Sequence, residues 1–291
     1  DGLSHGSRVQ IDASASDYID PDVLSLIRDF QNNVAPDRKI LINLKGFSRF
    51  PAFEDVMQFP DYSTSETQLQ LTQEEVLEVL AEGNQRFVED RRLNRDLIRQ
   101  VRSTADGQSP VAAILSCIDS RVPAEIVFDL GVGDIFSLRV AGNVVGTKSL
   151  GSLEYAVKVA GVKVVLVLGH TRCGAVTASA EFVAAEKTVS EETGCQNLQA
   201  IVNEIKPCVD SELASDRSRF FDQTGEVVSI EEPLVDEIAE RNVIRSVQEI
   251  VRRSDAIAQS VRDGEIVIRG AIYDVKTGRV EFLGDGSSSE S

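Results

Sequence analysis

The stretch LSCIDSR, residues 115 to 121, places a cysteine, an aspartate and an arginine at every second position after an apolar run. If the stretch is extended, Cys117, Asp119 and Arg121 project to the same side. A thiolate and a carboxylate could share a metal ion, with the arginine holding the acid. Alternatively, the thiol only packs in the protein interior, and the acid and base form a surface ion pair. The stretch alone leaves both interpretations open.

A second pair of metal-ligand residues follows another apolar run, VKVVLVLGH, residues 162 to 170. The run ends at His170, and Cys173 opens an expected helix, where the helix dipole favours a thiolate. Parallel sheets place functional residues beyond the carboxyl ends of their strands, so both pairs should meet at one edge. Two thiolates, an imidazole and a carboxylate suit Zn²⁺. A hydrogen-bonded core histidine is the alternative for His170, and His5 is the only other histidine in the chain.

The pattern around these residues predicts an α/β domain with a mainly parallel sheet flanked by helices. Apolar, β-branched runs predict strands, and runs with helical spacing predict helices between them. The expected strands are residues 111–117, 134–140 and 162–170, with a closing hairpin at 265–283 around KTGR. The expected helices are residues 72–90, about 94–104, 123–131, 149–161, 173–186 and about 232–261. Thr72 and Glu75 predict a capping box at the first of these helices.

Residues 1–48 predict a separate β-α-β segment. RVQIDA and KILINLKGF have strand character, and the residues between them have helical spacing, with Asp20 as the N-cap and Pro21 at the first helical position. The segment resembles the second half of a STAS domain, the cytosolic module of SulP-type anion transporters. The alternative is an N-terminal extension that packs on the main domain. Because the chain begins with Asp rather than Met, we expect a processed product or an excised piece of something longer.

Composition sets the remaining organisation and excludes some functions. Residues 49–68, with two prolines and many polar residues, predict a linker or arm, residues 69–284 the main domain and residues 285–291 a disordered tail. The net charge of −17 argues against nucleic acid and anionic membrane surfaces as partners. Four cysteines in 291 residues are too few for a disulfide scaffold, which favours a reducing, cytoplasmic setting.

Four motifs, CIDSR, GDIFSLRVAGN, GSLEYAV and GHTRCGA, occur in this order and resemble those of a β-class carbonic anhydrase of the plant-like branch. The resemblance covers residues 69–284. It implies a zinc enzyme that interconverts carbon dioxide and bicarbonate, built as a dimer or a multiple of dimers. It also implies Cys117, His170 and Cys173 as zinc ligands. The fourth position would hold a water or hydroxide, or Asp119 itself in a closed form.

The same resemblance implies a division of roles around the zinc ion. Zinc lowers the pKa of bound water to about 7, which makes hydroxide available at neutral pH. Asp119 would accept a hydrogen bond from that hydroxide and aim it at carbon dioxide, while Arg121 would hold Asp119 off the metal. The implied substrate contacts are a hydrogen bond from Gln108, a pocket lined by Phe136 and Tyr155, and the Gly174 N–H on bicarbonate.

Two other functions stay open at this point. Fold and ligands do not fix the substrate, so hydrolysis of a related linear molecule such as carbon disulfide is an alternative. The other is a non-catalytic, zinc-stabilised regulatory module of an anion transporter. In a fusion of that kind, an active anhydrase would supply or consume bicarbonate at the cytosolic face of the membrane. Asp119, Arg121 and Gln108 favour the enzyme, because a structural zinc needs none of them.

Overall fold

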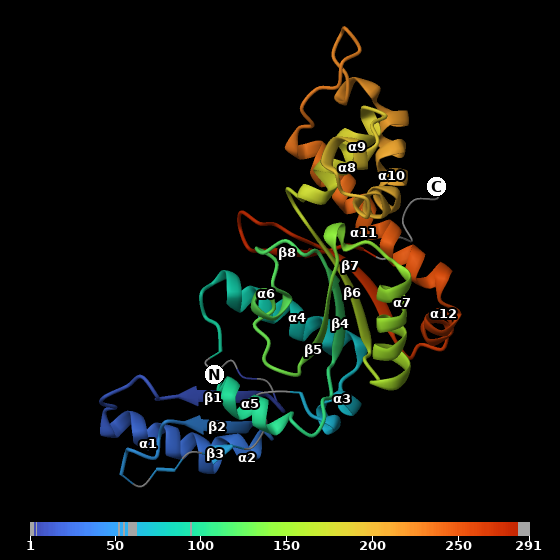
Figure 1. Cartoon of the computed structure of the whole chain (residues 1–291). Helices are drawn as coiled ribbons and strands as arrows, with labels where there is room; N and C mark the ends of the chain where they lie inside the picture. Colours follow the sequence, from blue (N-terminus) through green and yellow to red (C-terminus); the bar gives the residue numbers. More distant parts are fainter. Residues whose placement is uncertain are drawn as a thin grey trace. The chain divides into compact units, whose positions relative to one another are not determined.

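The computed structural model describes residues 3, 5–51, 53, 54, 56, 57, 63–93 and 95–284. The chain divides into two compact units, residues 1–61 and 62–291 (Figure 1). The tail predicted for residues 285–291 lies outside the described residues. Within the described ranges, no helix has the length and apolar content needed to cross a membrane.

The N-terminal unit is a small parallel β-α-β structure with one added strand. Its elements are β1 (Arg8–Asp12), α1 (Pro21–Asp29), the π-helical turn η1 (Phe30–Val34), α2 (Ala35–Asp37), β2 (Leu41–Lys45) and β3 (Val56–Met57). β1 pairs in parallel with β2, and β3 is antiparallel to β2. Asp20 caps α1 by accepting a hydrogen bond from the Asp22 N–H. The predicted β-α-β order is therefore present, and β3 lies within the stretch predicted as a linker.

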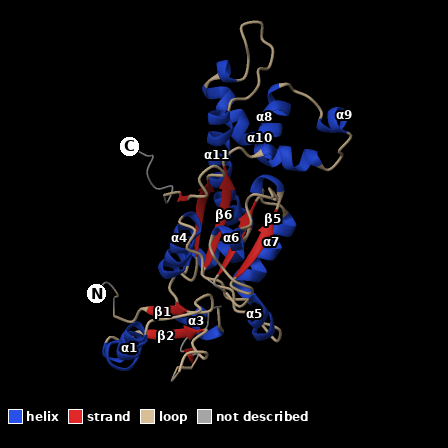
Figure 2. Cartoon of the chain, turned by 90° about the vertical axis from the view of Figure 1, so that its left-hand side faces the viewer, coloured by secondary structure: helices blue, strands red, loops and turns tan. Residues whose placement is uncertain are grey.

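Five strands form the sheet of the second unit, which Figure 2 draws in red. Their order is β5-β4-β6-β7-β8, with the labels shown in Figure 1. Their bounds are β4 (Ala112–Ser116), β5 (Ile135–Arg139), β6 (Val164–His170), β7 (Val267–Tyr273) and β8 (Val280–Phe282). All neighbours run parallel except β8, which is antiparallel to β7. Every residue of β4 and β6 is buried, as expected for central parallel strands that are covered on both faces. The mainly parallel sheet and the closing hairpin agree with the sequence prediction.

Helices cover both faces of this sheet. One face packs against α4 (Gln73–Val88) and α6 (Ala124–Val127). The other packs against α7 (Thr147–Glu154), the π-helical turn η3 (Tyr155–Val159), α11 (Glu232–Arg253) and α12 (Asp255–Arg262). Along β4, Ile114 belongs to the first cluster and Leu115 to the second, which is the alternation of a doubly covered strand. α3 (Ser65–Gln70), α4 with its predicted capping box and α5 (Leu97–Ser103) precede the sheet in the chain.

A third group of helices lies beyond the carboxyl ends of the strands (Figure 1). This group contains α8 (Gly174–Ala184), α9 (Val189–Thr193), α10 (Leu198–Ser215) and the 3₁₀ turn η4 (Arg217–Arg219). α8 and α10 share an apolar cluster with the first half of α11. Helices α9 and α10 go beyond the sequence prediction, and Pro207 interrupts the helical signal inside α10. The helical region predicted for about residues 232–261 consists of two helices, because Ser254 ends α11 and caps α12 through the Ile257 N–H.

Candidate metal centre

Three side chains come together where β4 and β6 end. Cys117 directly follows β4, His170 is the last residue of β6, and Cys173 directly precedes α8. One ligand atom from each lies within 4.8 Å of the others, and all three side chains are buried. The parallel register accounts for this, because Ser116 pairs with Leu168 and the two strands therefore end at the same level. The structure thus brings together the three residues predicted as metal ligands.

The orientation of His170 leaves one ring nitrogen available to a metal ion. Nδ1 lies 2.9 Å from the carbonyl oxygen of Thr171, so Nδ1 carries the proton and donates it to that oxygen. Nε2 then presents a lone pair, and it is buried without a hydrogen-bond partner among the described residues. Leaving a buried polar atom unpaired costs about 1–3 kcal/mol, a cost that a metal–ligand bond would remove. Two sulfurs and one imidazole nitrogen are a donor set that fits zinc.

The two thiols differ in pKa because they share one proton. The hydrogen bond from Cys173 lowers the pKa of Cys117 to about 4, and contacts with His170 and the Gly142 N–H act in the same direction. The contact with Cys117, together with burial, raises the pKa of Cys173. Cysteine binds a metal ion as the thiolate, so metal binding by Cys117 and Cys173 would be accompanied by release of protons.

Beside these ligands, Asp119 and Arg121 form a two-point ion pair. Arg121 Nε lies 2.9 Å from Asp119 Oδ1 and Nη2 lies 2.7 Å from Oδ2, while the Arg121 N–H also donates to Oδ1 at 2.9 Å. The hydrogen bond from the Arg121 side chain lowers the pKa of Asp119 to about 2, so the carboxylate is ionised at neutral pH. Asp119 Oδ2 lies 3.9 Å from His170 Nε2. Arg121 therefore holds the carboxylate next to the three-residue group and not within it.

Of the predicted substrate contacts, only Gly174 lies at the metal end of the sheet. It is the first residue of α8, directly after Cys173. The N–H groups of a first helical turn have no partner within the helix and attract anions. This position suits a contact with a bicarbonate oxygen.

The other three predicted contacts lie toward the amino end of the sheet. Gln108 precedes β4 and is exposed, and Phe136 pairs with Ala113 near the start of that strand. Four residues separate Ala113 from Cys117, which is about 13 Å along a strand. Tyr155 packs edge-on against Phe136, with ring centroids 6.1 Å apart, and it is 54% exposed. A single chain does not bring Gln108, Phe136 or Tyr155 to the metal ligands.

Residues on α11 hold the backbone of two turns beside the metal ligands, one after β6 and one after β5, and they were not predicted from the sequence. Asp236 accepts a hydrogen bond from the Arg172 N–H at 2.6 Å, and Asn242 donates to the Gly142 carbonyl at 2.7 Å. Both partners have left-handed backbones, with φ of 55° at Arg172 and 64° at Gly142. Asn242 could be recognised in the sequence as a polar residue within a helical stripe of buried residues. That stripe also contains Ile238, Ala239, Val243 and Ser246.

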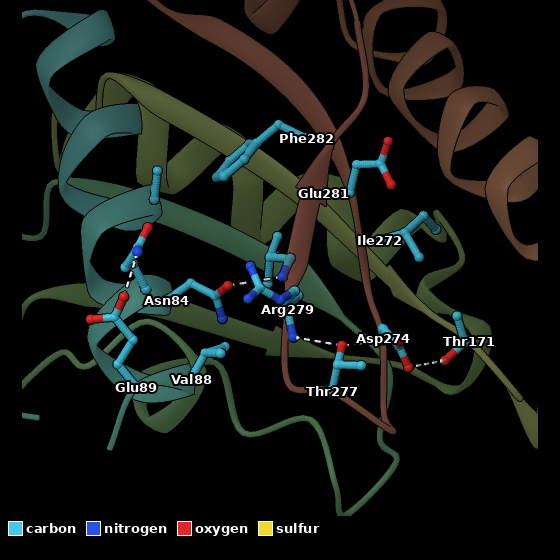
Figure 3. Close-up of a pocket in the computed structure, with 13 residues that line it drawn as sticks. Asn84, Val88, Glu89, Thr171, Ile272, Asp274, Thr277, Arg279, Glu281 and Phe282 are labelled. Carbon is cyan, nitrogen blue, oxygen red and sulfur yellow. Dashed lines mark hydrogen bonds between the residues drawn. The ribbon is translucent and has the colours of Figure 1, made fainter. Parts of the chain in front are cut away.

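A separate cavity of about 600 Å³ lies between α4 and the β7–β8 hairpin (Figure 3). Thr171, which follows His170 in the chain, forms part of its wall. The wall also carries three carboxylates, those of Glu89, Asp274 and Glu281, and none of the three metal-ligand side chains. With Arg279 as the one basic residue of the wall, the carboxylates leave a net negative charge, which disfavours an anion such as bicarbonate.

The part of the chain that carries the metal centre matches known proteins. The carbonic anhydrase family model matches residues 112–280. Carbonic anhydrase 2 of Mycobacterium tuberculosis is 37% identical over 201 residues, which cover 69% of this chain and 87% of that protein. The carbonic anhydrase of Mycolicibacterium smegmatis is 36% identical over 210 residues, covering 71% and 92%. The crystal structure of the β-carbonic anhydrase CafA of Aspergillus fumigatus is 25% identical with a TM-score of 0.53, covering 67% and 83%. The chain belongs to the β-carbonic anhydrase family.

As a β-carbonic anhydrase, the chain is a zinc enzyme that acts on carbon dioxide and bicarbonate. The predicted enzyme class, the zinc cofactor and the mainly parallel sheet are therefore confirmed. Cys117, His170 and Cys173 form a group that could hold the zinc ion. Residues 1–48 lie outside the family match, and these relatives give no support to the STAS-like resemblance or to a SulP fusion.

Proposed function

We propose that Cys117, His170 and Cys173 hold the zinc ion of this carbonic anhydrase, and that Asp119 and Arg121 direct its hydration of carbon dioxide. The observation that carries the proposal is the buried His170 Nε2, which has no hydrogen-bond partner among the described residues and faces two cysteine sulfurs. When bound, zinc supplies a hydroxide at neutral pH by lowering the pKa of its water.

In this proposal, Asp119 accepts a hydrogen bond from the attacking oxygen and thereby aims a lone pair of that oxygen at carbon dioxide. The carboxylate is ionised and lies beside the ligand group, which supports the role. Arg121 donates to both carboxylate oxygens and keeps Asp119 in this place. A closed form, with Asp119 as a fourth metal ligand, requires these charge-assisted bonds to break first.

A second copy of the chain would complete the substrate pocket of a homodimer or a multiple of dimers. Support comes from the distance of about 13 Å between the level of Phe136 and that of Cys117 within one chain. The exposed Tyr155 and Gln108 are then free to line the pocket of a neighbouring copy. The Gly174 N–H would contact bicarbonate within its own chain.

The proposal extends to the N-terminal unit and to the location of the protein. The parallel β1-α1-β2 arrangement supports a partial STAS-like segment at residues 1–48, to which β3 adds a strand from the stretch 49–68, and we place the anhydrase domain at residues 69–284. All four cysteines are free of disulfides, which supports a cytoplasmic setting. Transmembrane helices encoded upstream in the full gene would support a transporter fusion, and their absence there would remove it.

Stopped-flow measurement of carbon dioxide hydration by the zinc-loaded chain tests the proposed chemistry. We expect hydration across pH 7 to 9, with a rate at least about 100-fold above that of the metal-stripped protein. Carbon disulfide hydrolysis is measured on the same sample. Absence of carbon dioxide hydration by zinc-loaded protein, or a faster reaction with carbon disulfide, would contradict the proposal.

A further inference from the structure

The turn that follows β5 places a peptide N–H on one of the candidate zinc ligands. Gly142 lies in the 3₁₀ turn η2 (Ala141–Asn143), and its N–H donates to Cys117 Sγ across 3.3 Å in the protein interior. Gly142 and Asn143 have successive positive φ values of 64° and 44°. Two left-handed residues in a row are uncommon, so the turn needs support from outside itself.

That support comes from α11, 100 residues further along the chain. Asn242 Nδ2 donates to the Gly142 carbonyl oxygen at 2.7 Å, and Asn242 is only 2% exposed. One turn later on the same helix, Ser246 Oγ donates to the Asn143 carbonyl at 3.4 Å. The two carbonyls of the left-handed turn therefore each have a partner on α11.

Packing against α10 also limits the space beside Gly142. A Cβ atom added at Gly142 would lie 2.8 Å from Ile205 Cδ1 of α10, closer than ordinary van der Waals contact. A side chain at this position would require Ile205 to shift, and Asn242 restrains Gly142 through its carbonyl oxygen. Its N–H is left pointing at the Cys117 sulfur.

A hydrogen bond to a metal-bound thiolate draws electron density from the sulfur and fixes its direction. Groups that orient or polarise metal ligands in this way tune both the affinity and the electronic properties of the metal. Asn242 acts on this donor by position: it fixes the carbonyl of Gly142 and so restrains the backbone conformation of the residue whose N–H donates to Cys117.

We propose that Asn242 is a positioning residue of the metal centre, which acts through the backbone of Gly142 on the sulfur of Cys117. The inference rests on the ligand set proposed above. If that set is correct, loss of Asn242 changes the metal centre without removing a ligand.

Asn84 on α4 provides a matched control for a substitution at Asn242. It is also a buried asparagine on a helix, and its Nδ2 donates to the carbonyls of Val127 and Gly278. Its Oδ1 accepts the Val280 N–H at the edge of the sheet (Figure 3). None of these contacts involves a residue of the metal centre. Asn84→Leu should therefore show the effect of losing a buried amide on the fold alone.

The experiment compares Asn242→Leu and Asn84→Leu in the full chain. Zinc affinity is measured by chelator competition, the cobalt-substituted proteins are compared by their sulfur-to-cobalt charge-transfer band, and the metal-free proteins are compared by thermal unfolding. We expect Asn242→Leu to weaken zinc binding about 10- to 100-fold and to shift the cobalt band. Asn84→Leu should lower the unfolding temperature but leave zinc affinity within about twofold and the band in place.

Equal zinc affinity and an unshifted band in Asn242→Leu would overturn the inference, as would equal losses of zinc in both variants. If Asn242→Leu does not fold, Ser246→Ala removes the weaker bond to the same turn and should shift the band in the same direction by less. An unshifted band in that variant would then overturn the inference. The ligand set fails separately, if Cys173→Ser retains zinc at wild-type affinity.

Discussion

The two ends of the five-stranded sheet differ in how much of the site one chain completes. At the carboxyl end, Cys117, His170 and Cys173 lie within 4.8 Å of one another and are buried. Toward the amino end, Phe136 and Tyr155 contact each other, and Tyr155 remains 54% exposed. Under the proposed function, the single chain provides the metal ligands, whereas the substrate pocket is completed by a second copy of the chain. Four experiments test this difference, in decreasing order of expected effect.

The largest effect is expected from removing a ligand at the carboxyl end. Cys173→Ser should lose most of its zinc and lower carbon dioxide hydration more than about 1000-fold, because a hydroxyl is a much weaker zinc ligand than a thiolate. Metal content by mass spectrometry and stopped-flow hydration measure the two losses. Cys195→Ser is the control, since Cys195 is exposed and distant in sequence from the ligands. Wild-type zinc content in Cys173→Ser would disprove its assignment as a ligand.

A smaller loss of activity is expected when zinc stays bound and only Asp119, beside the metal ligands, is replaced. Asp119→Asn should retain zinc and lower kcat about 100-fold, because the neutral amide no longer accepts the hydrogen bond in the same way. Asp129→Asn is the matched control, because Asp129 is also paired with an arginine, Arg86, but lies outside the metal centre. Full activity of Asp119→Asn would show that Asp119 does not orient the nucleophile.

At the other end of the sheet, Tyr155→Ala should lower kcat/KM about 10-fold without changing zinc content. If the pocket is completed by a second copy, mixing this variant with Cys173→Ser after reversible dissociation should restore activity, up to roughly a quarter of the wild-type value. The hybrid has one site with an intact metal centre and an intact tyrosine from its partner. No recovery in verified hybrids would place Tyr155 in the pocket of its own chain, or outside any pocket.

The smallest effect concerns stability in the metal-free protein. The pKa of Asp119 is lowered from 3.8 to about 2 by Arg121, so its ion pair stabilises the fold fully above pH 3.8 and loses that effect as the pH falls toward 2. Wild type should therefore exceed Asp119→Asn by about 1 to 2 kcal/mol in urea unfolding, equally at pH 5 and pH 7, with the gap shrinking below pH 4. A stability difference between the two proteins that changes between pH 5 and pH 7 would show that the ion pair is not its source.

The ligand residues could be predicted because strand ends are local features of the sequence. Two apolar runs that each end in a metal-ligand residue fix Cys117 and His170 at one edge of a parallel sheet. Asn242 and Asp236 could not be predicted in the same way, because they reach the site from a helix that follows 60 or more residues later. Their partners are backbone atoms, which every residue has, so no residue type in the sequence indicates these contacts.

The pocket residues show a different limit. Phe136 and Tyr155 could be named from the family motifs, but no pattern in one sequence states which copy of the chain they serve. Helix α10, beyond the sheet, was not predicted for another reason: Pro207 interrupts its helical signal. Long-range packing and assembly decide these features, and neither is encoded in local spacing.

Zinc should be bound by two cysteines and one histidine of a single chain. Zinc K-edge X-ray absorption of the zinc-loaded chain measures this directly. We expect two sulfur neighbours at about 2.3 Å, one imidazole nitrogen at about 2.0 Å and one further light atom. A first shell with fewer than two sulfurs, or with no imidazole, would contradict it.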